Sequence, residues 1–99
     1  MYVLSELGDW YAKQCVDEWQ EEYGDHIDTL DNPGWSVKID LVRTALQDKP
    51  FQEVKFERSE HDWITASRNA KHFEAFGGPN NLHEMIEIFL SWVSATETV

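Results

Sequence analysis

Positive charge, cysteine and long apolar runs are all scarce in this chain. Its 99 residues carry 19 Asp and Glu against 8 Lys and Arg, a formal net charge of −11. A surface this acidic repels nucleic acid and anionic membranes, so we expect neither as a partner. No apolar run approaches the ~20 residues that span a bilayer, and no basic start precedes an apolar stretch, so we expect no membrane segment and no signal peptide. The one cysteine, Cys15, excludes an intrachain disulfide and suits a reducing cytoplasm.

The familiar catalytic and metal-binding motifs are also missing. The four histidines show no metal-ligand spacing, and neither HExxH nor CxxC occurs in the sequence. The sequence has no glycine-rich phosphate loop of the Walker type and no serine in a nucleophile elbow. We therefore expect no enzymatic activity, no bound metal and no cofactor.

Helical periodicity is present at both ends of the chain. In residues 4–23, apolar side chains recur at three- and four-residue steps. Cys15 lies on this apolar stripe, in the middle of the expected helix and with the acids Asp17 and Glu18 nearby, so we expect a buried core thiol. Residues 81–95 show the second helical pattern, with Asn81 as its N-cap and Glu84 placed to complete a capping box.

Short alternating segments between the two helices predict β-strands. The expected strands are residues 26–31, 35–42, 52–58, 62–68 and 72–76. Their tight connections are typical of an antiparallel meander, and Pro33-Gly34 predicts a type II turn with positive φ at Gly34. The order α-β-β-β-β-β-α predicts one α+β domain over residues 1–99. In it, an antiparallel sheet of about five strands carries an N-terminal and a C-terminal helix on one face.

Negative charge is concentrated toward the N-terminus. Residues 1–31 carry nine acids against one base, Lys13. Such a surface attracts basic proteins and speeds encounter with them, although solubility alone also explains a high net charge. A nuclease needs a basic groove to bind the phosphate backbone, and carboxylates can stand in for phosphates there. The partner-binding residues that we expect are Asp17, Glu18, Glu21, Glu22, Asp25 and Asp28.

A second candidate site lies where the C-terminal helix is expected to start. The sequence GGPNN at residues 77–81 leads directly into that helix. Glycines let a ligand approach the backbone, and free N–H groups at a helix start attract anions. The alternative is that the glycines only turn the chain and the last Asn only caps the helix. If three separate segments converge here, they line a small polar pocket formed by Trp35, Arg58, Trp63, Gly77, Gly78 and Asn81.

Three longer segments carry a family resemblance. They are LDNPGWSVKIDL at residues 30–41, FERSEHDW at residues 56–63, and the stretch from Phe73 to Trp92 that contains GGPNNL and IEIFLSW. Their order and spacing resemble the immunity protein 53 family of bacterial polymorphic toxin systems, over a region from about Trp10 to Trp92. The resemblance implies a cytoplasmic antitoxin that binds and blocks a cognate toxin.

Two functions follow from these observations. The first is a stoichiometric inhibitor that binds a basic, nuclease-like toxin and occludes its active site. The alternative is a domain that binds or senses a small anionic ligand at the glycine-rich helix start. Tight binding of one protein would support the first, and binding of an anionic metabolite would support the second. The sequence leaves the oligomeric state open.

Overall fold

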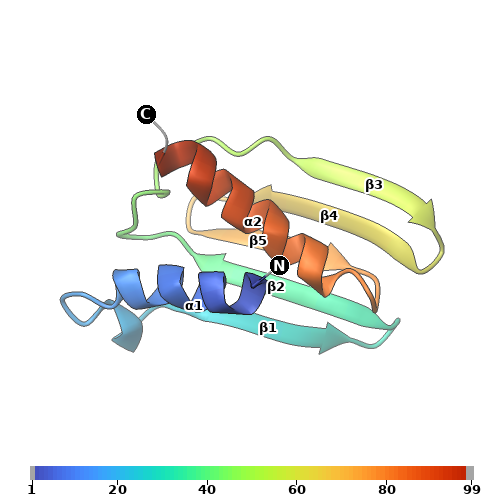
Figure 1. The fold of residues 1–99 in the computed structure, drawn as a ribbon, viewed down its shortest axis with the longest axis horizontal. Helices are drawn as coiled ribbons and strands as arrows, with labels where there is room; N and C mark the ends of the chain where they lie inside the picture. The colour runs from blue at the N-terminus through green and yellow to red at the C-terminus, as the bar shows by residue number, and fades with distance from the viewer. Residues whose placement is uncertain (1, 98–99) are drawn as a thin grey trace.

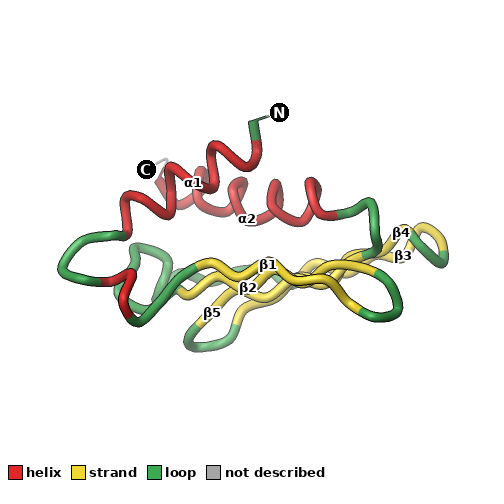
Figure 2. The backbone as a smooth tube through the Cα atoms, turned by 90° about the horizontal axis from the view of Figure 1, so that it is seen from below, coloured by secondary structure: helices red, strands yellow, loops and turns green. Residues whose placement is uncertain are grey.

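The computed structural model describes residues 2–97. The helices are α1 (Val3–Gln14), a short 3₁₀ helix η1 (Trp19–Glu21) and α2 (Leu82–Glu97). The strands are β1 (Asp25–Leu30), β2 (Gly34–Asp40), β3 (Val54–Ser59), β4 (Asp62–Arg68) and β5 (His72–Gly77). Both α-helices lie on one side of the sheet, so the molecule has two layers (Figure 2). This confirms the predicted α+β fold. Of the helices described, none has the length and apolar composition needed to cross a membrane.

The strand order in the sheet is β1-β2-β5-β4-β3, and every neighbouring pair is antiparallel. β2 therefore pairs with β5, and the predicted meander is wrong. The reason is that residues 41–53 form a crossover, which carries the chain from the end of β2 to the opposite edge of the sheet (Figure 1). The other connections between strands are short, as expected.

Side chains of the sheet and of α2 hold the crossover in place. The guanidinium of Arg68 donates hydrogen bonds to the carbonyls of Leu46 and Gln47, at 2.8 and 2.7 Å. The indole of Trp92 donates to the carbonyl of Pro50 at 2.9 Å. Leu46, within this segment, is buried in the hydrophobic core. The crossover thus closes one end of the hydrophobic core.

The core lies between the sheet and the helices. Val37 and Ile39 of β2 stand opposite Ala75 and Phe73 of β5, and residues directly opposite each other share a face of the sheet. All four are buried, which identifies this face as the one beneath α1 and α2. The other face carries mostly polar side chains, and neither α-helix covers it (Figure 2). Side chains on the open face include His26, Asp28, Ser36, Lys38, Glu74 and Phe76.

The first helix ends much earlier than predicted. After Gln14 the chain turns sharply, and η1 brings Trp19 back into the interior, where it is 1% exposed. The ring centroids of Trp10 and Trp19 lie 6.5 Å apart. In an unbroken helix the two residues would stand about 13 Å apart along the axis. The break at Gln14 thus allows Trp19 to pack against Trp10 in the interior.

The early end of α1 changes the surroundings of Cys15. It is the C-cap of the helix and only half-buried, and its thiol donates to the carbonyl of Tyr11 at 3.4 Å. The buried face of α1 consists of Val3, Leu7 and Trp10. The predicted buried core thiol is therefore wrong, because Cys15 lies outside the helical stripe that contacts the sheet.

Candidate functional site

Acidic side chains gather where α1 gives way to β1. Between Lys13 and Lys38 the sequence has seven Asp or Glu residues and no Lys or Arg. The structure places these acids on the turn after α1, on and after η1, along β1 and in the turn after it. The turn after α1, η1 and the start of β1 adjoin at one end of the molecule (Figure 1). Five of the six predicted partner-binding residues are exposed: four lie at this end, and Asp28 lies farther along β1 on the open face of the sheet. We call these five the acidic corner: Asp17, Glu18, Glu21, Glu22 and Asp28.

None of these five carboxylates is neutralised within the described part of the chain. The Lys and Arg ion pairs found there join Arg58 to Asp62 and to Glu84, far from this end. Two of the described cations lie nearby. The Arg43 guanidinium donates to the backbone carbonyl of Asp17 at 3.1 Å, and Lys38 lies beside Asp28 on the open face of the sheet. Among residues 2–97, neither forms an ion pair with the five carboxylates, so the acidic corner presents net negative charge to solvent.

The backbone at the tip of the acidic corner is unusual. Asp17 and Glu18 have φ values of 52° and 64°, in the left-handed region that few residues other than glycine adopt. Arg43, which holds this turn from the crossover side, has a φ of 65° itself. Such conformations cost roughly 1 kcal/mol or more each, so the surrounding structure must impose them. The turn thereby fixes the backbone from which these two exposed side chains project.

Asp25 differs from the other predicted partner-binding acids. It stands opposite Ile39 on the helix-covered face of the sheet and is half-buried. Its Oδ1 is buried with no hydrogen-bond partner among the described residues. Burial, together with the nearby charge of Asp40, raises the pKa of Asp25 to about 6. The structure therefore turns this carboxyl inward, away from the acidic corner.

The residues of the second candidate site meet at the other end of the sheet. The indole of Trp35 donates to the carbonyl of Pro79 at 2.9 Å. The amide oxygen of Asn81 accepts hydrogen bonds from the backbone N–H groups of Gly78 and Trp63, at 3.1 and 3.3 Å. Three segments that are distant in sequence thus converge on the start of α2.

Arg58 joins this cluster from β3. Its guanidinium pairs with Asp62 at 2.7 Å and with Glu84 at 2.6 Å, and Asp62 also accepts a hydrogen bond from the amide of Asn81. The Arg58 guanidinium, with help from Asn81, lowers the pKa of Asp62. The predicted capping box is wrong, because Glu84 pairs with Arg58 and the amide oxygen of Asn81 binds groups outside the helix.

Protein atoms occupy the space beside Gly77 and Gly78, where a side chain would otherwise lie. A Cβ at Gly78 would collide with the carbonyl oxygen of His61, and one at Gly77 would lie 2.6 Å from the sulfur of Met85. The N–H of Gly78 also donates to the carbonyl of Trp63 at 3.1 Å. These two glycines therefore allow close packing of the chain on itself.

The hollow beside this cluster has a volume of about 430 Å³. Asp62 and Glu84 line it together with Arg58, so a small anion would meet two carboxylates as well as the guanidinium. Sequence reasoning had not identified these two acids as partners of Arg58. The four-residue spacing of Arg58 and Asp62 across a tight turn was a usable signal, whereas nothing local in the sequence pointed to Glu84.

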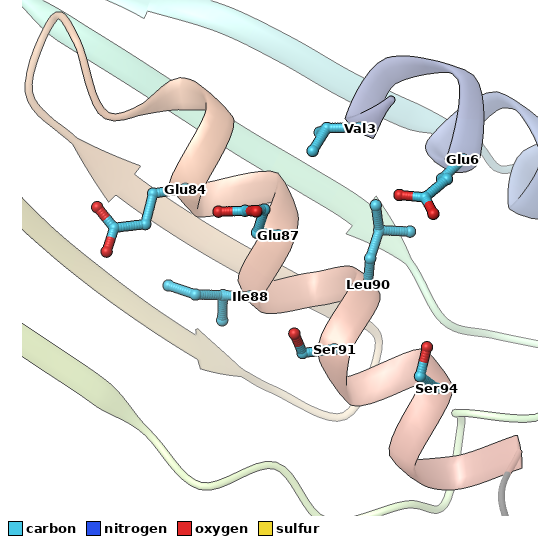
Figure 3. Close-up of a pocket in the computed structure, with 8 residues that line it drawn as sticks. All are labelled: Val3, Glu6, Glu84, Glu87, Ile88, Leu90, Ser91 and Ser94. Atoms are coloured by element: carbon cyan, nitrogen blue, oxygen red, sulfur yellow. The ribbon is translucent and has the colours of Figure 1, made fainter. Parts of the chain in front are cut away.

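A further hollow, of about 650 Å³, lies on the outer side of the helical layer (Figure 3). Glu6 of α1 and Glu84 and Glu87 of α2 line it, above the apolar side chains of Ile88 and Leu90. α2 contains no Lys or Arg, so this surface is acidic as well. Nowhere in residues 2–97 do three His, Cys, Asp or Glu side chains form a group that could hold a metal ion.

The described surface is acidic both at the acidic corner and around the hollow beside α2. A family model described as Immunity protein 53 matches residues 4–94, nearly the whole chain. The chain therefore belongs to the Immunity protein 53 family and is an immunity protein, which confirms the resemblance found in the sequence. It has no significant match among curated proteins or among solved structures.

Proposed function

We propose that this immunity protein acts in the cytoplasm as a non-enzymatic antitoxin. It binds a cognate toxin through the acidic corner and covers a basic groove that the toxin uses to hold a nucleic-acid backbone. The observation that carries this proposal is the set of five exposed carboxylates with no Lys or Arg in the intervening sequence and no ion pair among the described residues.

Physical chemistry supports a basic partner of this kind. Complementary charge raises the rate at which two proteins meet, and a pair of opposite charges that is buried in the interface strongly affects dissociation. A nuclease groove is lined with Lys and Arg because it must neutralise phosphates. The backbone turn that carries Asp17 and Glu18 is fixed in the free protein, so binding in such a groove needs ordering of their side chains but not of the turn.

The alternative function, binding of a small anionic ligand near Gly78, has less support. The N–H of Gly78 is already hydrogen-bonded to protein oxygens. The adjoining hollow presents the carboxylates of Asp62 and Glu84. An anion would be repelled by both.

Reversing the charge of three residues of the acidic corner tests the proposal. The toxin encoded by the adjacent gene, carrying an inactivating substitution, is mixed with the immunity protein in a stopped-flow instrument. We expect Glu18→Lys, Glu21→Lys and Glu22→Lys together to lower the association rate constant about tenfold or more, because they remove electrostatic steering. The free energy of unfolding should change by less than about 0.5 kcal/mol per site, since these side chains are exposed.

A second triple variant is the matched control. Glu53→Lys, Glu57→Lys and Glu60→Lys change the net charge equally, but these exposed acids lie at the β3 edge of the sheet. We expect this variant to associate clearly faster than the first. Equal slowing by both would show that only net charge matters, and unchanged rates in both would place the interface elsewhere.

A further inference from the structure

The two edges of the sheet differ in how they are protected. β3 carries Lys55 and Arg58, and its pairing with β4 has a register shift between Glu57 and Ser59. Charged side chains, Lys above all, and irregular pairing are common means by which proteins prevent an edge strand from pairing with another chain. β1 pairs with β2 without any register shift and contains no Lys, Arg or Pro. The charged groups of β1 are acidic (Asp25 and Asp28), so this edge repels another acidic strand but not a basic one.

The backbone groups at the β1 edge are correctly directed for another strand. The N–H of Asp40 donates to the carbonyl of Gly24 at 3.1 Å, just before β1 begins. In an antiparallel pair the hydrogen-bonded residues alternate, so the even-numbered residues of β1 bond to β2. The N–H and C=O groups of Ile27 and Thr29 consequently point away from β2. Residues 26–29 are exposed, and β1 lies at the rim of the sheet (Figure 1).

The charge around this edge selects the occupant. A second copy of the chain would bring net charges of −11 together, whereas a Lys- and Arg-rich segment would be attracted. On the open face of the sheet, a Lys or Arg beside Asp28 would form a favourable cross-strand pair. On the helix-covered face, Ile27 is 37% exposed and offers an apolar neighbour. The edge therefore fits a strand in which basic and apolar residues alternate.

We infer that β1 pairs with an extended, basic segment of the toxin, which adds a sixth strand to the sheet. This inference rests on the proposed function and adds backbone hydrogen bonds to the charge contacts of the acidic corner. The six residues of β1 span roughly 20 Å, which suits a recognition strand of similar length.

Amide hydrogen exchange in the free protein and in its complex with the inactivated toxin tests the pairing directly. We expect exchange at Ile27 and Thr29 to be fast in the free protein and to slow about tenfold or more in the complex. His26 and Asp28 should be protected in both states, because their N–H groups already bond to β2. A complex that leaves Ile27 and Thr29 unprotected would overturn the strand pairing but keep the proposed function, and the absence of any complex would overturn both. Protection that rises with the concentration of the immunity protein alone would instead identify a second copy as the occupant.

A proline variant adds a functional readout. Ile27→Pro removes an N–H that β2 does not use, and Ile27→Val keeps that N–H with a similar side chain. We expect the proline variant to bind the toxin about tenfold more weakly and the valine variant to bind normally. Equal affinities, with circular dichroism showing both variants folded, would contradict the inference. If the proline variant does not fold, the exchange experiment decides alone.

Discussion

Asp25 is the residue whose environment departs most from what its type prefers. Its carboxyl lies on the covered face of the sheet, with one oxygen buried and unpartnered among the described residues. Because burial raises its pKa from 3.8 to about 6, the charged form is disfavoured in the folded state. The stability linked to this group is therefore present below about pH 4 and is lost as the pH rises through about 6.

Replacing Asp25 with Asn should stabilise the protein at neutral pH. We expect the free energy of unfolding at pH 7 to rise by about 1–2 kcal/mol, less than the full shift in pKa implies because the carboxylate keeps some contact with water. Near pH 4 the gain should vanish, since Asp25 is then protonated in the native protein. Urea unfolding at both pH values measures this. Asp28→Asn, at an exposed site in the same strand, should change stability by less than about 0.5 kcal/mol, and equal effects of the two substitutions would contradict the assignment.

At the scale of the element, β2 and β5 come unusually close where β2 begins. Gly34 pairs with Leu30 in the hairpin, and its φ is not positive, so the predicted type II turn with a left-handed glycine is wrong. A Cβ at Gly34 would instead collide with the carbonyl oxygen of Gly77. The glycine is needed because the backbones of two strands approach each other, which the local turn sequence could not reveal.

Substituting Gly34 separates this explanation from a general effect of glycine. We expect Gly34→Ala to lower the free energy of unfolding by about 1–3 kcal/mol, because a backbone oxygen cannot move aside as a flexible side chain can. Gly8→Ala in α1, where nothing lies within 4 Å of the added Cβ, should raise it by up to about 1 kcal/mol through helix propensity. Thermal unfolding of the two variants measures both effects. A Gly34→Ala protein as stable as the parent would show that β2 and β5 can accommodate a Cβ at this position, and would contradict the explanation.

At the scale of the whole molecule, the two signs of charge occupy different parts of the chain. Seven of the eight Lys and Arg residues fall within residues 32–71, and residues 14–31 contain none. In the fold, β1, η1 and α2 consequently carry no Lys or Arg, whereas β3 and the crossover do. Under the proposed function, this uneven charge orients an approaching basic toxin toward the acidic corner.

This field predicts a clear dependence on salt. We expect the association rate with the inactivated toxin to fall as NaCl rises from low to physiological concentration, because the screening length shrinks to about 8 Å. Stopped-flow measurements over a range of salt concentrations give the slope. The Glu18, Glu21 and Glu22 triple reversal should flatten that slope. An association rate of the parent protein that ignores salt would argue against electrostatic steering.

The sequence by itself determined the charge and the number and order of the main helices and strands. Hydrophobic periodicity is a local property, so the second helix and the strand at Asp62–Arg68 could be located from it, and the excess of carboxylates before residue 31 could be counted directly. The family resemblance also rested on local motifs, and the match over residues 4–94 confirmed it.

Only the tertiary structure decided how these parts face one another. The pairing of β2 with β5, the break of the first helix at Gln14 and the ion pair of Arg58 with Glu84 each depend on contacts between residues far apart in sequence. The direction of Asp25 also depends on such contacts, because nothing in the sequence distinguishes it from the neighbouring acids. It turns inward because the register sets it opposite Ile39, and that register depends on the pairing of two strands. The local sequence determines which side chains a segment carries. The packing of the whole chain determines whether those side chains point into the core or toward solvent.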